Sequence, residues 1–221
     1  MLRLRSAQTA DLRSAARAAL RSPWAKPLLF LICFGPMAWL LRGIWLEELG
    51  ANPAEFLIRA TGDWTLRALC LVLTVTPLRV TLGLPELARL RRMAGLFTGF
   101  YACLHLICYA WFDMGWDLSD ITSDIVKRPF ILVGFMGWLL LSLLSATSFN
   151  AAIRALGSKR WQALHRVVYG VAALAMVHFF WMRAGKQNFA EVAVYAGILG
   201  GLLGWRLRRA WRVWLSAKPQ R

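Results

Sequence analysis

The chain has 221 residues, of which 58% are hydrophobic, and it contains 12 tryptophans. So large an apolar share excludes a single water-soluble domain and predicts a multi-span membrane protein. The formal net charge of +16 would favour nucleic acid as the partner of a soluble protein, but here the basic residues crowd at the ends of apolar runs, where they set membrane topology, so nucleic-acid binding is excluded as well.

Residues 1–26 form a basic segment ahead of the first apolar run. Its one acid is Asp11, against the basic residues Arg3, Arg5, Arg13, Arg17, Arg21 and Lys26. The alanine-rich middle fits a short basic helix on an anionic membrane surface, and it fits a frayed tail equally well. Because no small-x-small cleavage site follows the next apolar run, we expect that run to be a retained anchor.

Six apolar runs follow, each near the roughly 20 residues that cross a bilayer core. They predict membrane-spanning helices at residues 27–46, 64–84, 93–112, 130–147, 161–182 and 189–206. Pro36 and Pro77 are expected to kink the first two helices, and neighbouring helices can satisfy the freed carbonyls. The sequence thus predicts an all-α integral membrane protein, with a six-helix transmembrane bundle at 27–206 and a basic tail at 207–221.

The connecting segments alternate in charge, which predicts the orientation. The basic segments contain Arg79, Arg89, Arg91 and Arg92, then Arg154, Lys159 and Arg160, then Arg206, Arg208, Arg209, Arg212, Lys218 and Arg221. The acidic segments contain Glu47, Glu48, Glu55 and Asp63, then Asp113, Asp117, Asp120 and Asp124. By the positive-inside rule, the basic segments and both termini face the cytoplasm. No internal repeat stands out, and the loops are too short for a nucleotide-binding domain.

The three histidines of the chain all fall inside predicted spans: His105 in 93–112, and His165 and His178 in 161–182. An imidazole within the membrane is costly, so each is a candidate functional residue. On one ideal helix, His165 and His178 would be roughly 20 Å apart along the axis, at two different levels. His105 and His178 both lie near the outer ends of their spans and therefore at similar depth.

Two imidazoles at one depth predict the axial ligands of a b-type haem, whose macrocycle is buried between apolar helices. Small residues near the two ligands would let a flat macrocycle approach, although such residues also serve helix packing in general. They are Gly99 and Ala102 beside His105, and Gly170 and Ala173 beside His178. Zinc, which needs three or four clustered ligands, is not favoured. A helix-to-helix hydrogen bond is the alternative for this pair, and haem is preferred.

His165 lies at the opposite, inner level. At that depth the 93–112 span offers Arg91, Arg92 and Met93 but no histidine, so a second bis-histidine site is not completed. Three roles stay open for His165: ligation of a second haem with a weak partner, contact with a flavin or quinone, and a hydrogen bond between helices.

Several motifs carry a resemblance to a known family. They are GDWTLRALCLVLTVTPLR at the 64–84 span, RRMAGLFTGFYACLHLICYAW around His105, KRPFILVGF at the start of the 130–147 span, SATS at 145–148, RWQALHRVVY around His165 and HFFW from His178. In these stretches the chain resembles the MsrQ (YedZ) family, the haem-binding membrane subunits of the bacterial periplasmic methionine sulfoxide reductase system. The resemblance covers nearly all of residues 27–206. The transmembrane core of that family is similar to those of ferric reductases and NADPH oxidases.

The resemblance implies that His105 and His178 are haem ligands and that His165 is the family's third histidine, with haem b present once, or twice if His165 holds a second. It also implies FMN, for which no motif is visible in the residues. The implied role is an electron-transfer subunit of the bacterial inner membrane with no substrate-converting site of its own. Electrons from the quinone pool or a cytoplasmic flavin reductase would reach the periplasmic molybdoenzyme MsrP, which repairs methionine sulfoxide in oxidised proteins.

Two alternatives accompany this interpretation. One is a quinol-linked or ferric-reductase-type cytochrome with another acceptor, which the residues alone do not separate from the first reading. The other is a non-redox helical transporter or scaffold, which the lack of paired intramembrane acids and of broken-helix repeats disfavours. The acidic stretch 113–124 is a candidate docking surface for a periplasmic partner, and an acidic outer loop also follows from topology alone.

Overall fold

The computed structural model describes residues 2–185, 187 and 189–216, with side chains from residue 11 onward in these ranges. The elements formed there are all helical, and six helical stretches are long and apolar enough to cross a membrane, which confirms the predicted fold class. Lys218 and Arg221 of the predicted tail lie outside the described residues. The chain divides into two compact units, Met1–Asp117 and Leu118–Arg221.

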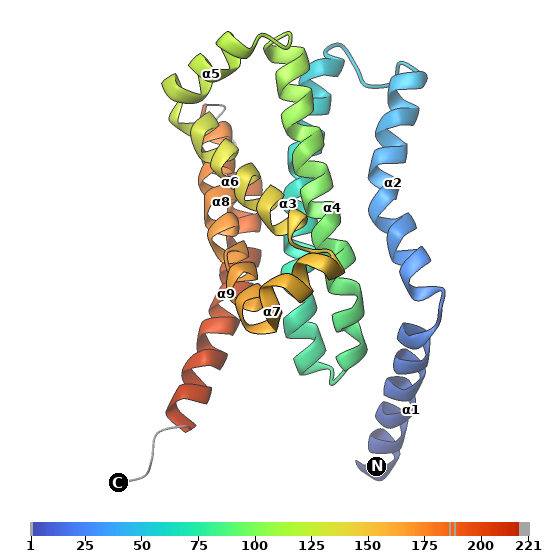
Figure 1. The fold of residues 1–221 in the computed structure, drawn as a ribbon. Helices are drawn as coiled ribbons and strands as arrows, with labels where there is room; N and C mark the ends of the chain where they lie inside the picture. The colour runs from blue at the N-terminus through green and yellow to red at the C-terminus, as the bar shows by residue number, and fades with distance from the viewer. Residues whose placement is uncertain (1, 186, 188, 217–221) are drawn as a thin grey trace. The chain divides into compact units, whose positions relative to one another are not determined.

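The first unit contains four α-helices and two short helical segments (Figure 1). They are α1 (Leu2–Arg21), α2 (Ala25–Trp45), α3 (Pro53–Thr81), the 3-10 helix η1 (Pro85–Leu87), α4 (Ala88–Cys108) and the π-helical η2 (Tyr109–Asp113). The most extensive packing joins α3 to α4, and α2 packs against both. Fully buried side chains such as Leu40, Leu73 and Tyr101 form the interior of this unit.

The helix α3 begins at Pro53, so the predicted start at residue 64 is wrong. The Asn52 side chain accepts a hydrogen bond from the Glu55 backbone N–H at 3.1 Å, and Pro53 occupies the first turn, two features that favour a helix start. An ion pair between Glu55 and Arg59 at 2.6 Å supports the next turn. Hydropathy missed these turns because they carry charges. Glu55 and Asp63 belong to this helix and not to an acidic loop.

Tyr101 on α4 forms hydrogen bonds with two backbone groups of α2 close to Pro36. The Tyr101 hydroxyl donates to the Cys33 carbonyl at 2.7 Å and accepts the Met37 N–H at 3.2 Å. In an uninterrupted helix, those two backbone groups would bond to each other. The hydroxyl of this buried side chain therefore ties α2 to α4 next to the proline of α2.

The N-terminal segment is a helix, and side chains hold it to the α3–η1 turn. Arg21 donates two hydrogen bonds, at 3.0 and 2.8 Å, to Oε1 of the buried Glu86. Arg17 donates to the Gly83 carbonyl at 2.9 Å. In the opposite direction, Arg89 donates to the Leu20 and Arg21 carbonyls, each at 3.3 Å. Of the two options left by the sequence, the structure therefore has the helix and not the frayed tail.

The second unit consists of α5 (Leu118–Lys127), α6 (Pro129–Ala146), α7 (Asn150–His165), α8 (Val168–Ala184) and α9 (Ala190–Ser216). Its main packing joins α6 to α8, and α9 packs on α8 (Figure 1). The short helix α5 was expected to be a loop, and its Asp124 is buried in an ion pair with Arg128 at 2.8 Å. Asp124 is therefore largely withdrawn from the acidic docking surface considered above.

The predicted span 161–182 lies within one of the six apolar helical stretches, Asn150–Ala184, but it is not one continuous helix, because α7 ends at His165 and α8 begins at Val168. A second break lies within α7 at Gly157, whose φ of 72° suits a residue without a side chain. His165 and His178 consequently lie on different helices, and the spacing of one ideal helix does not relate them. At the other end of the unit, α9 runs ten residues beyond the predicted boundary at 206, so the described part of the basic tail is helical.

Candidate functional site

His105 lies in the last turn of α4, and its half-buried ring packs against α3. Its Nδ1 lies 2.9 Å from the carbonyl oxygen of Ile58. A carbonyl oxygen only accepts hydrogen bonds, so Nδ1 carries the proton and donates it. The neutral ring then has its lone pair on Nε2, the nitrogen through which a histidine held in this way binds a metal.

Gly62 forms the surface on which the His105 ring rests. A Cβ atom at Gly62 would lie 3.1 Å from Cε1 and 3.2 Å from Nδ1 of that ring. Ile58 and Gly62 are four residues apart and so occupy the same face of α3. The Thr61 hydroxyl lies 3.4 Å from Nδ1 and donates to the Leu57 carbonyl at 2.7 Å. The ring thus contacts a carbonyl and a glycine on successive turns of one helix.

His178 on α8 has the same arrangement in the second unit. Its Nδ1 lies 2.7 Å from the carbonyl oxygen of Phe130, so this nitrogen also donates. A Cβ atom at Gly134 would lie 2.8 Å from both Cε1 and Nδ1 of the ring, closer than real Cβ atoms approach. Phe130 and Gly134 on α6 are again four residues apart. The two histidines therefore share one local geometry, although the sequence contains no repeat that would have predicted it.

His165 has different contacts at the end of α7. Its Nε2 lies 3.3 Å from the Thr147 hydroxyl, which itself donates to the Leu143 carbonyl at 2.8 Å. When the hydroxyl gives its proton to Leu143, it can accept a hydrogen bond from Nε2–H of His165. The Trp161 ring lies against the His165 ring, tilted by 30° with centroids 4.0 Å apart, and its indole N–H donates to the Thr147 carbonyl at 2.8 Å. His165 and Trp161 together hold the C-terminal end of α6.

The three predicted histidines are thus located, His105 in the first unit and both His165 and His178 in the second. Sequence reasoning missed Ile58, Gly62, Phe130 and Gly134, because backbone carbonyls carry no sequence signal, although a glycine within an apolar helix is a hint of close approach. Of the small residues expected near the ligands, Gly99 and Ala102 are buried, whereas Gly170 and Ala173 are exposed on α8. That His105 and His178 face each other across one iron stays a prediction.

The donor set fits haem iron. A porphyrin supplies four nitrogens of its own, so its iron needs only one or two further ligands from the protein, and separately held imidazoles could provide them. In both His105 and His178, the donated Nδ1 proton selects the tautomer that such a ligand needs. Among the described residues, no group of three or more His, Cys, Asp or Glu side chains gathers to hold a metal ion by itself.

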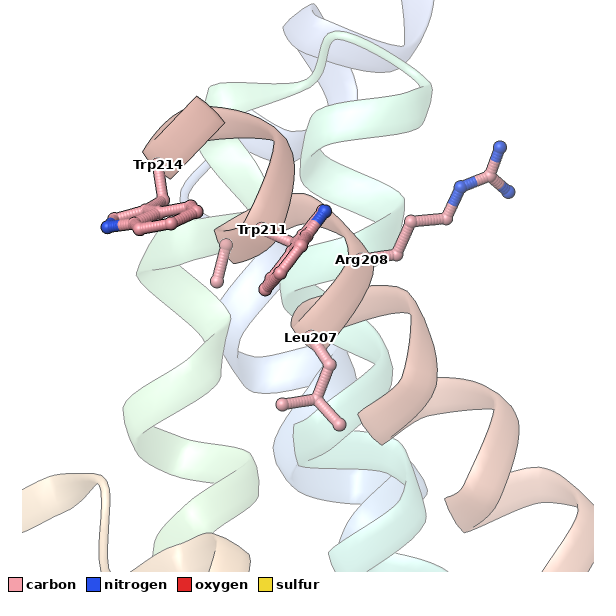
Figure 2. A pocket seen from close by; sticks show the side chains of 5 residues that line it. Leu207, Arg208, Trp211 and Trp214 are labelled. Atoms are coloured by element: carbon pink, nitrogen blue, oxygen red, sulfur yellow. The ribbon is translucent and has the colours of Figure 1, made fainter. Parts of the chain in front are cut away.

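A hollow of about 640 Å³ lies at the C-terminal turns of α9 (Figure 2). Leu207, Trp211 and Trp214 follow one side of the helix, and Arg208 extends away from Trp214. Exposed tryptophans and arginines at the end of a spanning helix are typical of the membrane–water interface. The hollow is lined by no histidine, and we assign it to that interface.

Residues 61–177 match the family described as the ferric reductase like transmembrane component, a range that includes His105 and His165 and ends immediately before His178. A protein of Polaromonas naphthalenivorans is 62% identical over 89% of this chain and 88% of its own length. Relatives from Herminiimonas arsenicoxydans (47%; 85% of this chain, 86% of the relative) and Xanthomonas campestris (42%; 87% and 86%) carry the same name. That name is protein-methionine-sulfoxide reductase heme-binding subunit MsrQ. No solved structure matches the chain.

Proposed function

Because the chain belongs to the ferric reductase-like transmembrane family and, within it, to the MsrQ subunits, we propose that it is the haem-binding membrane subunit of a methionine sulfoxide reductase system. It carries electrons through the membrane and converts no substrate with its own residues. The residues proposed for haem ligation are His105 and His178.

One observation supports this function above the others. His105 and His178 both donate Nδ1–H to a backbone carbonyl while the ring lies against a glycine. An imidazole that only joined two helices would need one such bond, and neither the tautomer nor the glycine contact would have to recur. The recurrence in two separate units is expected if both rings serve the same chemistry, namely axial ligation through Nε2.

When bound, haem supplies reversible one-electron transfer at its iron. The contribution of the chain is to hold each imidazole at a constant angle, to keep Nδ1 protonated and to surround the site with apolar side chains. Because the Ile58 and Phe130 carbonyls are parts of helices, they shift little when the charge at the site changes. Rigid ligands of this kind keep reorganisation small during electron transfer.

We place the protein in the bacterial inner membrane with both termini in the cytoplasm, following the alternation of basic and acidic segments. The donor is the quinone pool or a cytoplasmic flavin reductase, and the acceptor is the periplasmic enzyme MsrP. FMN is included on the family resemblance alone. Lipid contacts the exposed apolar side chains of the spanning helices.

The test is an absorption spectrum of the detergent-purified chain, oxidised and then reduced with dithionite, with haem and flavin quantified against protein. A Soret band that sharpens on reduction, with resolved alpha and beta bands, is the expected signature of six-coordinate b-type haem. A colourless protein, expressed with ample haem, would contradict the proposal and would mean that the histidines serve only helix packing. Oxidation of the reduced haem by MsrP with methionine sulfoxide, but not by ferric chelates, would separate this acceptor from that of a ferric reductase.

His165→Ala is expected to leave the His105 and His178 haem in place. The Nε2 contact of His165 with Thr147 favours a structural role, and a second haem would have to use Nδ1. The haem-to-protein ratio decides: an unchanged ratio supports the hydrogen-bond role, and a fall from two to one identifies a second haem. Loss of all haem from a folded His165→Ala protein would contradict the pairing of His105 with His178.

A further inference from the structure

Gly62 and Gly134 lie beneath the histidine rings. Of the glycines described in each unit, they are the ones where an added Cβ would come closest to a ring. At Gly134 the nearest ring atoms lie at 2.8 Å from the position of a Cβ, and at Gly62 they lie at 3.1 Å. We propose that Gly62 and Gly134 are positioning residues: the missing side chain lets each imidazole sit on the helix surface, where it donates Nδ1–H to the carbonyl four residues earlier. The inference rests on the proposed haem ligation by His105 and His178.

The steric argument is direct for Gly134. A methyl group there overlaps the ring, and the neighbouring atoms that could yield are those of the His178 imidazole itself. The ring would have to rise from α6, and its 2.7 Å hydrogen bond to Phe130 would lengthen or break. At Gly62 the overlap is smaller, so His105 would shift by a few tenths of an ångström. The larger effect is therefore expected at Gly134.

Two other glycines, one on α6 and one on α4, show that this closeness is specific. A Cβ at Gly137, one turn beyond Gly134 on α6, would meet only Leu174 Cβ at 3.9 Å, an ordinary contact. A Cβ at Gly95 on α4 would meet only Val72 Cγ2 at 3.8 Å. Alanine stabilises a helix interior relative to glycine wherever space is open. These two positions consequently provide matched controls for the same substitution.

The hydrogen bond at Nδ1 also affects the iron. Donation of Nδ1–H to a carbonyl increases the basicity of Nε2, and a more basic axial ligand favours the ferric state. Loosening the Phe130 bond should therefore make the haem easier to reduce and shift its potential upward. Gly62 and Gly134 would thus set the potential of the electron carrier as well as the position of its ligands.

The experiment compares Gly134→Ala with Gly137→Ala in the full-length, detergent-purified protein. We expect Gly134→Ala to raise the haem potential, alter the low-spin electron paramagnetic resonance signal and weaken haem retention by about tenfold or more, the usual size of effects from partners of metal ligands. Gly137→Ala should leave all three unchanged. Gly62→Ala, measured against its control Gly95→Ala, should also raise the haem potential, but by less than Gly134→Ala does. Equal potentials and spectra for Gly134→Ala and Gly137→Ala would overturn the proposal.

If Gly134→Ala misfolds, circular dichroism will detect lost helicity. In that case the double variant His178→Gly with Gly134→Ala tests whether the clash with the ring is the cause. Removal of the ring makes room for the methyl group, so recovered helicity supports the clash, and continued misfolding rejects it. The proposed function fails by another result: a wild-type chain without haem, or full haem in His105→Ala and His178→Ala. Nitrogen NMR of labelled histidine in the haem-free protein also reports whether Nδ1 keeps its proton in Gly134→Ala.

Discussion

Alanine at His178, or at His105, is expected to abolish most haem retention, because each substitution removes an axial ligand proposed for the same iron. The loss should be similar for the two variants, since both rings are held alike by a carbonyl and a glycine. Haem per protein, measured as the pyridine haemochrome after detergent purification, gives the result. Any residual haem should be five-coordinate and high-spin, because one axial position has lost its nitrogen.

The control for this experiment is His165→Ala, which removes an imidazole of the same size from the end of α7. All three variants need unchanged helicity, so that lost haem is not lost structure. If one of His105→Ala and His178→Ala keeps its full six-coordinate spectrum, the two residues do not ligate a single iron. The pairing of His105 and His178 by membrane depth would then be wrong.

The second large effect is expected for Tyr101→Phe, which should destabilise the first unit. The substitution leaves the Cys33 carbonyl and the Met37 N–H without the hydroxyl that serves both. A buried polar group left unsatisfied costs about 1–3 kcal/mol, so loss of one or both should lower the thermal unfolding midpoint clearly. Unfolding in detergent, followed by circular dichroism, measures the change.

Tyr169→Phe is the matched control, because it deletes the same hydroxyl from a partly exposed ring whose face contacts the Arg206 guanidinium at 5.6 Å. That variant should unfold within error of the wild type. Equal midpoints for Tyr101→Phe and Tyr169→Phe would mean that α2 satisfies its own backbone near Pro36. The two hydrogen bonds of Tyr101 would then contribute little to the stability of the first unit.

The motifs that carried the family resemblance pair up in space within each unit. The stretch GDWTLR begins at Gly62, which contacts His105 of the RRMAGLFTGFYACLHLICYAW stretch. The stretch KRPFILVGF contains Phe130 and Gly134, which hold His178. The stretch SATS contains Thr147, which contacts His165. Motifs that are distant in the sequence therefore contact each other in pairs, and these contacts explain why the motifs contain these particular residues.

Hydropathy and charge alone were sufficient to predict an all-helical membrane protein with six spans and to single out His105, His165 and His178. These are local or additive properties: an apolar run must leave water wherever it folds, and a histidine within it is costly in any arrangement. The same locality explains two errors. The charged first turns of α3 were read as a loop despite the Asn52 cap, and the break after His165 has no proline or glycine at 166–167 to mark it.

Tertiary structure alone decided how the histidines are held. Whether Nδ1 or Nε2 carries the proton depends on which acceptor lies opposite the ring, and a backbone carbonyl has the same chemistry in every residue of the sequence. Only the packing of α4 on α3, and of α8 on α6, brings Ile58 and Phe130 to these rings. The need for glycine at 62 and 134 follows for the same reason, because the space between two packed helices depends on both helices and cannot be read from the sequence of either one.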